Sequence, residues 1–438
     1  MQPYDGRRTC FAEAIPDAIA VIPSASIRLR NSDTEFEFRQ DSDFHYLTGF
    51  PEPDSVLVVR PKDNKERFIL FVRPRDRAKE IWNGRRYGPE GALAEFGVDA
   101  AYEIGQLDDK LADFMVGART LYYRFGEDER MDRRVQEALA KARDRVRRGG
   151  NAPRAIEEPG TILHEMRLLK TPAEIEKMRR ACEITRLGHV AGMRATRPGV
   201  HEYEIEATIE HAYRANGAHN AYPSIVASGD NATILHYHEN SDQLKDGDLI
   251  LVDSGCEYDL YASDVTRTWP INGRFSAEQR AIYEIVLAAQ KAAIEEVRPG
   301  RPFSAYHEAA VNVTVDGLLD VGLLKGTRDE ILEQQRYNDY FMHRTGHFLG
   351  LDVHDVGRYL ELDGSTSRKL EAGIVVTVEP GIYVHRDLNC DERFKGIGVR
   401  IEDDILCTAR GPENLSAEIP KEIAELESIV GADVLEHA

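Results

Sequence analysis

The stretch from Leu249 to Thr268 sets two acidic residues among apolar ones, and this pairing constrains the fold more than any other feature. The apolar run ending at Val252 predicts a buried strand that finishes on Asp253. A Gly-containing turn follows, and a second short strand is predicted to carry Asp264. Burying a carboxylate is costly unless its charge is compensated. Two carboxylates at one site also repel each other unless a proton or a metal lies between them. The chain is therefore expected to present this pair to metal ions.

Each acid also has a simpler interpretation, because a lone carboxylate after a strand is usually a turn former or a helix cap. The metal hypothesis depends on further polar residues in the same part of the chain. Glu379 and Glu402 interrupt apolar runs that predict strands, and His343, His347 and His354 lie close together in the sequence. Four carboxylates and one imidazole suit a pair of divalent ions, with Mn²⁺ favoured and Co²⁺, Zn²⁺ or Fe²⁺ also admitted. A water between two such ions loses a proton near neutral pH and becomes a nucleophile.

Length and apolar runs predict two domains. A chain of 438 residues has room for two or more. Apolar runs at 18–22, 55–59, 68–72 and 120–123, bounded by turn residues, predict the strands of an N-terminal α/β domain over residues 1–160. A charged helix is expected over 128–148, before two glycines. Residues 161–438 are assigned to a second, catalytic domain.

The second domain carries a weak internal repeat. Two capping boxes, Thr171-Pro-Ala-Glu174 and Ser276-Ala-Glu-Gln279, each open a helix that is closed by Arg-Pro-Gly. Further amphipathic helices follow at 203–216 and 304–321. This pattern predicts two pseudo-symmetric halves, each laying its helices on one face of an antiparallel sheet. Chance similarity of two Arg-Pro-Gly stops is the alternative.

Charge and cysteine usage exclude several classes of function. A net charge of −20 argues against nucleic acid as a partner, because phosphate backbones recruit Lys and Arg. The five cysteines are odd in number and contain no Cys-x-x-Cys, which favours reduced thiols in a cytoplasmic protein. We expect neither a signal peptide nor a membrane span, because no long apolar run is present.

Several segments together resemble the "pita-bread" metallopeptidases and, among them, the Xaa-Pro aminopeptidase (aminopeptidase P) family. In the second domain the matching segments are 252–258, 264–268, 343–350, 378–383 and 399–403. In the first domain 30–36, 41–44, 46–50 and 82–86 look like that family's substrate-side segments. The resemblance implies an α/β N-terminal domain followed by an α+β pita-bread domain, with a pseudo-twofold repeat around a curved antiparallel sheet.

The resemblance also implies a role for each of the matching residues. The implied metal ligands are Asp253, Asp264, His347, Glu379 and Glu402, with Asp264 and Glu402 bridging two ions. The implied catalytic residues are Glu379, His354, His236 and Arg400, with Glu379 as general base and proton shuttle and His354 facing the developing oxyanion. The implied substrate-binding residues are His343, beside the prolyl ring, with Tyr383, Trp82 and Asp33. Core packing is the alternative role for Trp82.

The implied reaction is hydrolysis of the N-terminal Xaa-Pro bond of peptides by a metal-bridging hydroxide. A prolidase, which cleaves only Xaa-Pro dipeptides, would have the same metal site and stays the main alternative. A methionine aminopeptidase would not require the N-terminal domain. A non-catalytic pita-bread binding protein or a metal-free creatinase-like hydrolase is expected to lack ligands, and none of the five is missing here. The family implies a homodimer or homotetramer. Two residues depart from expectation: His238 has no evident role, and Arg344 adds a positive charge next to His343.

Overall fold

Buried residues form a separate core in each of two units of the chain. In this computed structural model, which describes residues 3–432, the chain divides between Met166 and Arg167. The boundary expected at residue 160 coincides with the start of helix α7 (Gly160–Leu168). Within the described part of the chain, no helix has the length and apolar character needed to cross a bilayer.

The first unit is built on a mixed six-stranded sheet. Its strands are β1 (Ala18–Pro23), β4 (Val56–Val59), β5 (Phe68–Val72), β6 (Ala100–Glu103), β7 (Thr120–Tyr122) and β8 (Ala155–Glu157), in the order β6-β5-β4-β1-β7-β8. The pairs β1–β4 and β4–β5 are antiparallel and the other pairs are parallel. The four apolar runs in the sequence therefore form strands as predicted.

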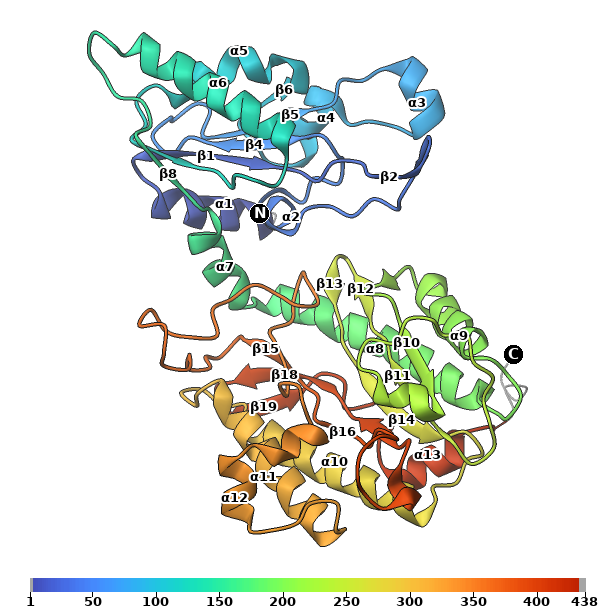
Figure 1. Ribbon diagram of the computed structural model, residues 1–438. Coiled ribbons are helices and arrows are strands. Elements are labelled where there is room, and N and C mark those ends of the chain that lie inside the picture. The colour runs from blue at the N-terminus through green and yellow to red at the C-terminus, as the bar shows by residue number, and fades with distance from the viewer. Residues whose placement is uncertain (1–2, 433–438) are drawn as a thin grey trace. The chain divides into compact units, whose positions relative to one another are not determined.

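Helices cover both faces of this sheet, which explains why its central strands β1, β4 and β5 are apolar along their whole length. Helices α5 (Leu107–Met115) and α6 (Glu129–Arg145) lie on one face, and α1 (Pro3–Ala14) lies on the other (Figure 1). Ile19 and Val21 of β1 belong to the same buried cluster as the apolar side chains of α5 and α6. The remaining elements of this unit are β2 (Leu29–Asn31), β3 (Thr34–Glu35), α2 (Ser42–Thr48), α3 (Arg77–Asn83) and α4 (Gly88–Glu95).

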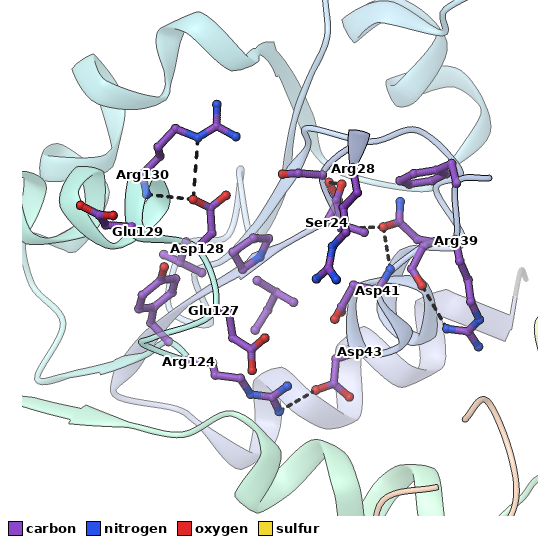
Figure 2. Close-up of a pocket in the computed structure, with 18 of the residues that line it drawn as sticks. Ser24, Arg28, Arg39, Asp41, Asp43, Arg124, Glu127, Asp128, Glu129 and Arg130 are labelled. Atoms are coloured by element: carbon purple, nitrogen blue, oxygen red, sulfur yellow. Dashed lines mark hydrogen bonds and ion pairs between the residues drawn. The ribbon is translucent and has the colours of Figure 1, made fainter. Parts of the chain in front are cut away.

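A pocket of about 630 Å³ opens at the carboxyl ends of the parallel strands β1 and β7 (Figure 2). Some of its charged side chains pair within the lining or cap a helix. Arg124 contacts Asp43 at 3.2 Å, and Asp128 caps α6 by accepting from the backbone N–H of Arg130 at 2.8 Å. The pocket belongs to the first unit alone.

Over its described residues, 167–432, the second unit contains only antiparallel strand pairs, arranged in two similar halves (Figure 1). The first half combines helices α8 (Pro172–Ala195) and α9 (Glu202–Ala215) with the sheet β10 (Ile225–Ser228), β11 (Leu249–Asp253) and β14 (Thr266–Pro270). The second half combines α10 (Ala277–Glu295) and α11 (Ser304–Asp320) with β15 (Val375–Val378), β18 (Asp403–Thr408) and β19 (Gly411–Asn414). These halves are the pseudo-symmetric repeat expected from the sequence.

Shorter elements lie within the two halves or after them. They are β9 (His219–Asn220), β12 (Cys256–Tyr258), β13 (Tyr261–Ala262), α12 (Arg328–Glu333), β16 (Gly381–Tyr383), β17 (Gly398–Arg400) and α13 (Ile423–Ile429). Strand β12 pairs with β9 and β13, and β16 pairs with β17. One buried cluster includes side chains from both halves, so the second unit has a continuous core.

Capping and close helix packing fix the repeated helix pairs. The predicted capping boxes are present: the Glu174 carboxylate accepts the backbone N–H of Thr171 at 2.9 Å, and Ser276 caps α10. Gly188 lets α9 approach α8 closely, because a Cβ there would lie 2.6 Å from the ring of Tyr213. A side chain at this position would therefore push the two helices apart.

Candidate metal centre

All four predicted acidic ligands lie where a strand ends or is interrupted. Asp253 is the last residue of β11, as predicted. Asp264 was expected within a strand, but it lies between β13 and β14, where its backbone N–H donates to the carboxylate of Asp404 at 3.1 Å. This bond replaces the one that a neighbouring strand would supply.

The strands expected to carry Glu379 and Glu402 are likewise each split in two. Glu379 lies between β15 and β16, because Pro380 has no N–H to donate and cannot continue the ladder. Glu402 lies between β17 and β18, and its own N–H donates to the carbonyl of Thr266 on β14 at 3.1 Å. An acid placed at a break can turn toward the site instead of following the alternation of a strand.

His347 is held by main-chain contacts with β15. Its N–H donates to the hydroxyl of Thr377 at 3.1 Å, and its carbonyl accepts the N–H of Thr377 at 2.9 Å. The preceding Gly346 permits this approach, since a Cβ there would lie 2.0 Å from the Thr377 carbonyl oxygen. Nδ1 of His347 lies 2.9 Å from the Phe348 carbonyl, which leaves Nε2 as the atom that faces the acids.

The structure brings these five side chains together. Nε2 of His347 lies 3.3 Å from Asp264 and 3.7 Å from Glu379. Ligand atoms of Asp264, His347 and Glu402 all lie within 4.8 Å of one another. The hydroxyl of Tyr222 joins Asp253 to the cluster, at 2.7 Å from its carboxylate and 2.5 Å from that of Asp264.

Burial and mutual repulsion make this cluster electrostatically unfavourable without cations. Burial raises the pKa of Glu402, and repulsion from Asp264, Glu379 and Asp253 raises it further. Burial also raises the pKa of Glu379, to about 7, against the attraction of His347 and Arg400. The pKa of His347 is lowered by burial but raised more by Asp264 and Glu379, and the result is about 9.

One fixed cation, Arg400, compensates part of this charge. Its guanidinium donates to Asp253 at 2.6 Å and to the Tyr383 hydroxyl at 3.0 Å. Tyr383 lies 2.9 Å from Nε2 of His343, whose pKa is lowered to about 3 by burial and by Arg400. His343 is therefore neutral, with Nδ1 facing the carbonyl of Arg344 at 2.7 Å.

The donor set fits a pair of divalent ions. Four carboxylates and one imidazole are the ligands that Mn²⁺ and neighbouring first-row ions accept. The raised pKa values of Glu379 and Glu402 come from burial and crowded negative charge, which bound dications would compensate. Asp253, Asp264, His347, Glu379 and Glu402 are the residues that would hold such ions.

Two of the predicted substrate-side histidines of the second unit, His354 and His236, face solvent. His354 is exposed, and its ring centre lies 4.3 Å from that of His347. The loop after His354 is anchored because Asp355 is paired with Lys170 at 3.0 Å and with Arg167 at 2.7 Å. His236 is also exposed, and its ring stacks on that of His238 at 6.3 Å.

The two predicted substrate residues of the first unit lie on its surface. Trp82 on α3 is 86% exposed, so the alternative of core packing is wrong. Asp33 lies exposed in the turn between β2 and β3. Their role toward a substrate stays a prediction.

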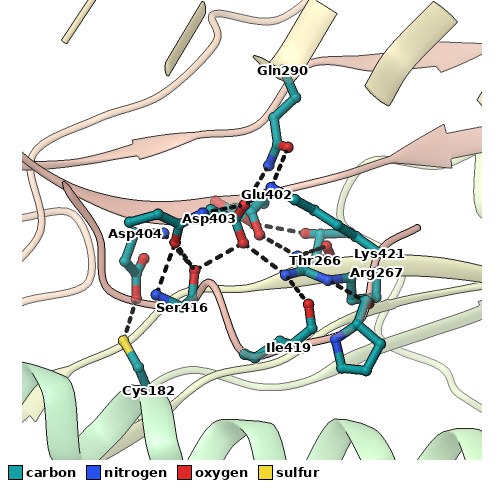
Figure 3. Close-up of polar contacts among 12 residues, drawn as sticks. Cys182, Thr266, Arg267, Gln290, Glu402, Asp403, Asp404, Ser416, Ile419 and Lys421 are labelled. Atoms are coloured by element: carbon teal, nitrogen blue, oxygen red, sulfur yellow. Dashed lines mark hydrogen bonds and ion pairs between the residues drawn. The ribbon is translucent and has the colours of Figure 1, made fainter. Parts of the chain in front are cut away.

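A second buried carboxylate, Asp403, lies directly after Glu402 and has very different surroundings (Figure 3). Its oxygens accept from Arg267 at 2.7 Å, from Ser416 at 2.8 Å and from Gln290 at 3.0 Å, and Lys421 pairs with it as well. Burial raises its pKa, but the two cations lower it more, so the pKa of Asp403 ends well below its ordinary value.

Sequence reasoning missed several residues that shape the site. Tyr222 touches two of the acids, and Thr266 donates to Glu402 at 2.6 Å. Asp404 accepts from the backbone of Asp264, and Cys182 donates to Asp404 at 3.2 Å. These contacts join residues far apart in the chain, so no local pattern indicates them.

Two family models match this chain. The model described as metallopeptidase family M24 matches residues 176–409, and the model described as aminopeptidase P, N-terminal domain, matches residues 4–122. All five members of the donor set lie within the first of these ranges.

Full-length relatives and solved structures agree with these matches. The chain is 44% identical to an Xaa-Pro aminopeptidase of Haemophilus influenzae, over 98% of this chain and 96% of the relative. It is 42% identical to an Xaa-Pro aminopeptidase of Escherichia coli, over 98% of each chain. The structure of aminopeptidase PepP from Pseudomonas aeruginosa superposes with a TM-score of 0.95 at 45% identity, covering 98% of this chain and 97% of that one. Aminopeptidase P from E. coli with the inhibitor Pro-Leu gives a TM-score of 0.94 at 42% identity, covering 98% of each chain.

Proposed function

Because the chain belongs to metallopeptidase family M24 and carries an aminopeptidase P N-terminal domain, we propose that it removes the N-terminal residue from peptides whose second residue is proline. The observation that carries this proposal is the convergence of four buried or half-buried carboxylates and His347 on one site of that fold. The Xaa-Pro aminopeptidases that it resembles over 98% of its length support the choice of substrate.

Glu379 is suited to move the proton of the reaction. Two divalent ions held by the donor set would supply a hydroxide nucleophile from water and polarise the scissile carbonyl. The Glu379 carboxylate lies 3.7 Å from His347 and 3.8 Å from His343, so it faces both the ligands and the proposed proline side. Glu379 takes the proton of the attacking water and returns it to the proline nitrogen as the C–N bond breaks.

The exposed histidines, together with the hydrogen-bonded series Arg400, Tyr383 and His343, bind and orient the substrate. His354 donates to the carbonyl oxygen as negative charge develops on it, and the loop that follows it is fixed by buried ion pairs of Asp355. His236 contacts the peptide from the other exposed position. Arg400 orients Tyr383, which in turn orients His343. The His343 side chain lies beside the proline ring.

The remaining assignments are also part of the proposal. They are Mn²⁺ as the preferred ion, a homodimer or homotetramer as the assembly, a cytoplasmic location, and substrate contacts by Asp33 and Trp82. Reduced cysteines are consistent with the location, since all five cysteines are free in the structure.

Metal reconstitution tests the proposal. The protein is dialysed against a chelator, divided, and restored with Mn²⁺, Co²⁺ or Zn²⁺ before incubation with Ala-Pro-Ala and Ala-Pro. We expect no cleavage in chelator and release of alanine from the tripeptide after addition of Mn²⁺. Cleavage of the dipeptide alone would identify a prolidase instead. Failure of every restored sample to cleave either peptide would refute the proposal.

A further inference from the structure

Arg344 is a positively charged side chain beside the site that the proposed mechanism does not use. It lies in the irregular segment that connects His343 to His347, and its side chain is exposed. Among the described residues, no carboxylate or other side chain pairs with its guanidinium. Its main-chain carbonyl, by contrast, lies 2.7 Å from Nδ1 of His343. An exposed, unpaired guanidinium next to a binding residue is available to a ligand.

Arg344 itself supplies the positive charge in this part of the site. Its charge reaches His307 on α11, whose pKa is lowered to about 4 by burial and then by Arg344. His307 in turn lies 2.8 Å from the hydroxyl of Thr345, in the same irregular segment. Both causes lower the pKa of His307, so its imidazole is neutral and adds no charge of its own beside Arg344. The acids of the donor set gather instead around His347.

The position of Arg344 in the sequence limits which part of a peptide it can meet. This step rests on the proposed function, in which His343 lies beside the proline ring. Consecutive Cα atoms are about 3.8 Å apart, so the long side chain of Arg344 starts within reach of the residue that follows proline. A guanidinium recognises carboxylates through two parallel N–H donors, and this fork matches both oxygens.

We propose that Arg344 binds a carboxylate on the leaving part of the substrate and so determines specificity. Two sources share this chemistry. One is the free C-terminus of a short peptide such as Xaa-Pro-Yaa, and the other is an Asp or Glu side chain directly after proline. Long peptides with a neutral residue at that position gain nothing from Arg344.

Matched substrate pairs separate the two sources. The Mn²⁺-loaded enzyme is given Ala-Pro-Ala and its C-terminal amide, then Ala-Pro-Asp-amide and Ala-Pro-Asn-amide. We expect the carboxylate member of at least one pair to have a kcat/KM about fivefold higher, as for a partly exposed charge pair. The first pair reports the C-terminus and the second reports the side chain. The preference should shrink as ionic strength rises, because salt screens exposed charges.

Three variants assign the preference to this side chain. Arg344→Gln should bring the ratio within each pair close to one, with little change for the amide substrates. Arg344→Lys should keep part of the preference, because the charge remains while the fork is lost. Arg410→Gln removes an equal charge from the exposed turn between β18 and β19, and should leave the ratios unchanged.

A binding measurement without turnover provides a second readout. Pro-Leu and its C-terminal amide are titrated calorimetrically into the wild-type enzyme and into Arg344→Gln. The wild-type enzyme should bind Pro-Leu, with its free carboxylate, about fivefold more tightly than the amide. Arg344→Gln should bind the two equally. Equal cleavage within both pairs by wild type, or ratios that persist in Arg344→Gln, would overturn the role of Arg344 while leaving the proposed function intact. If the loaded enzyme cleaves none of the four peptides, the proposed function itself is wrong.

Discussion

Glu402 and Asp403 are neighbours in the sequence and both are buried, yet the protein treats their charges in opposite ways. Asp403 is surrounded by Arg267, Lys421 and neutral donors, and its pKa is lowered. Glu402 accepts one hydrogen bond from Thr266 and faces other acids, and its pKa is raised. Both side chains are at most 1% exposed, so burial alone does not distinguish them.

The difference separates a structural carboxylate from a proposed metal ligand. A buried charge that has its own cations stabilises the fold around it and has no need of a metal ion. A buried cluster of carboxylates without cations is costly, and compensation by bound metal would turn that cost into affinity. Arg267 also donates to the main-chain carbonyl of Glu402 at 2.6 Å, so the structural cluster holds Glu402 in place.

The largest effect should come from Glu379. Replacing it by Gln keeps its size but removes the carboxylate that we propose moves the proton, so we expect kcat/KM for Ala-Pro-Ala to fall roughly 10³-fold, or about 4 kcal/mol in the barrier. Glu333→Gln on the exposed surface of α12 is the control and should retain full activity. Loss of less than tenfold at saturating Mn²⁺ would remove Glu379 from its role.

Asp403→Asn should damage stability instead. The substitution leaves Arg267 and Lys421 buried without their counter-charge, and breaking such a pair costs about 3 kcal/mol or more. Urea unfolding of the metal-free protein measures this loss, with Asp387→Asn, an exposed position, as control. An unchanged unfolding midpoint would show that the two clusters do not differ as described.

The pH dependence of stability should differ in sign between the clusters. In metal-free protein the pKa of Glu379 is raised by burial from 4.5 to about 7. Between these values the folded state binds more protons than the unfolded state, so this contribution is fully present below pH 4.5 and is lost as pH rises toward 7. The contribution is at most about 3 kcal/mol. Asp403 behaves oppositely. Because its pKa is lowered, its ionised carboxylate stabilises the fold above pH 3.8, and this stabilisation is lost only in stronger acid.

Urea unfolding from pH 4.5 to 7.5 in chelator tests this sign. Subtracting the curve of Glu379→Gln from that of wild type should give stability that falls with pH. Saturating Mn²⁺ should abolish the slope, and Asp403→Asn should leave it unchanged over this range. A difference that rises with pH would contradict the raised pKa of Glu379.

The smallest change is expected for Glu402→Gln in metal-free protein. The raised pKa favours a protonated Glu402, which Gln resembles, so stability should stay within about 1 kcal/mol of wild type. Stabilisation by Mn²⁺ should distinguish the two proteins, because Gln lacks the negative charge of the proposed bridging carboxylate. Thermal unfolding with and without Mn²⁺ measures both effects. A Tm that rises equally in both proteins on adding Mn²⁺ would exclude Glu402 as a ligand.

Much of the architecture was predictable because it is encoded locally. Four of the strands in the first unit are continuous apolar runs, and both capping boxes lie within four consecutive residues. The same local reasoning failed at the acids, where it predicted unbroken strands through Asp264, Glu379 and Glu402. Pro380 was the one local signal of a break. The other two breaks come from Asp404 and Thr266, which bind main-chain N–H groups from distant segments.

The sequence by itself determined which side chains are available: four acids and a histidine, in an order that matches one family. It could not say which acids are compensated, because Glu402, Asp403 and Asp404 are consecutive and chemically alike. Only the tertiary structure decided that Arg267 and Lys421 reach Asp403 and leave Glu402 among carboxylates. The physical reason is that a buried charge depends on its neighbours in space, and here those neighbours come from other strands and loops.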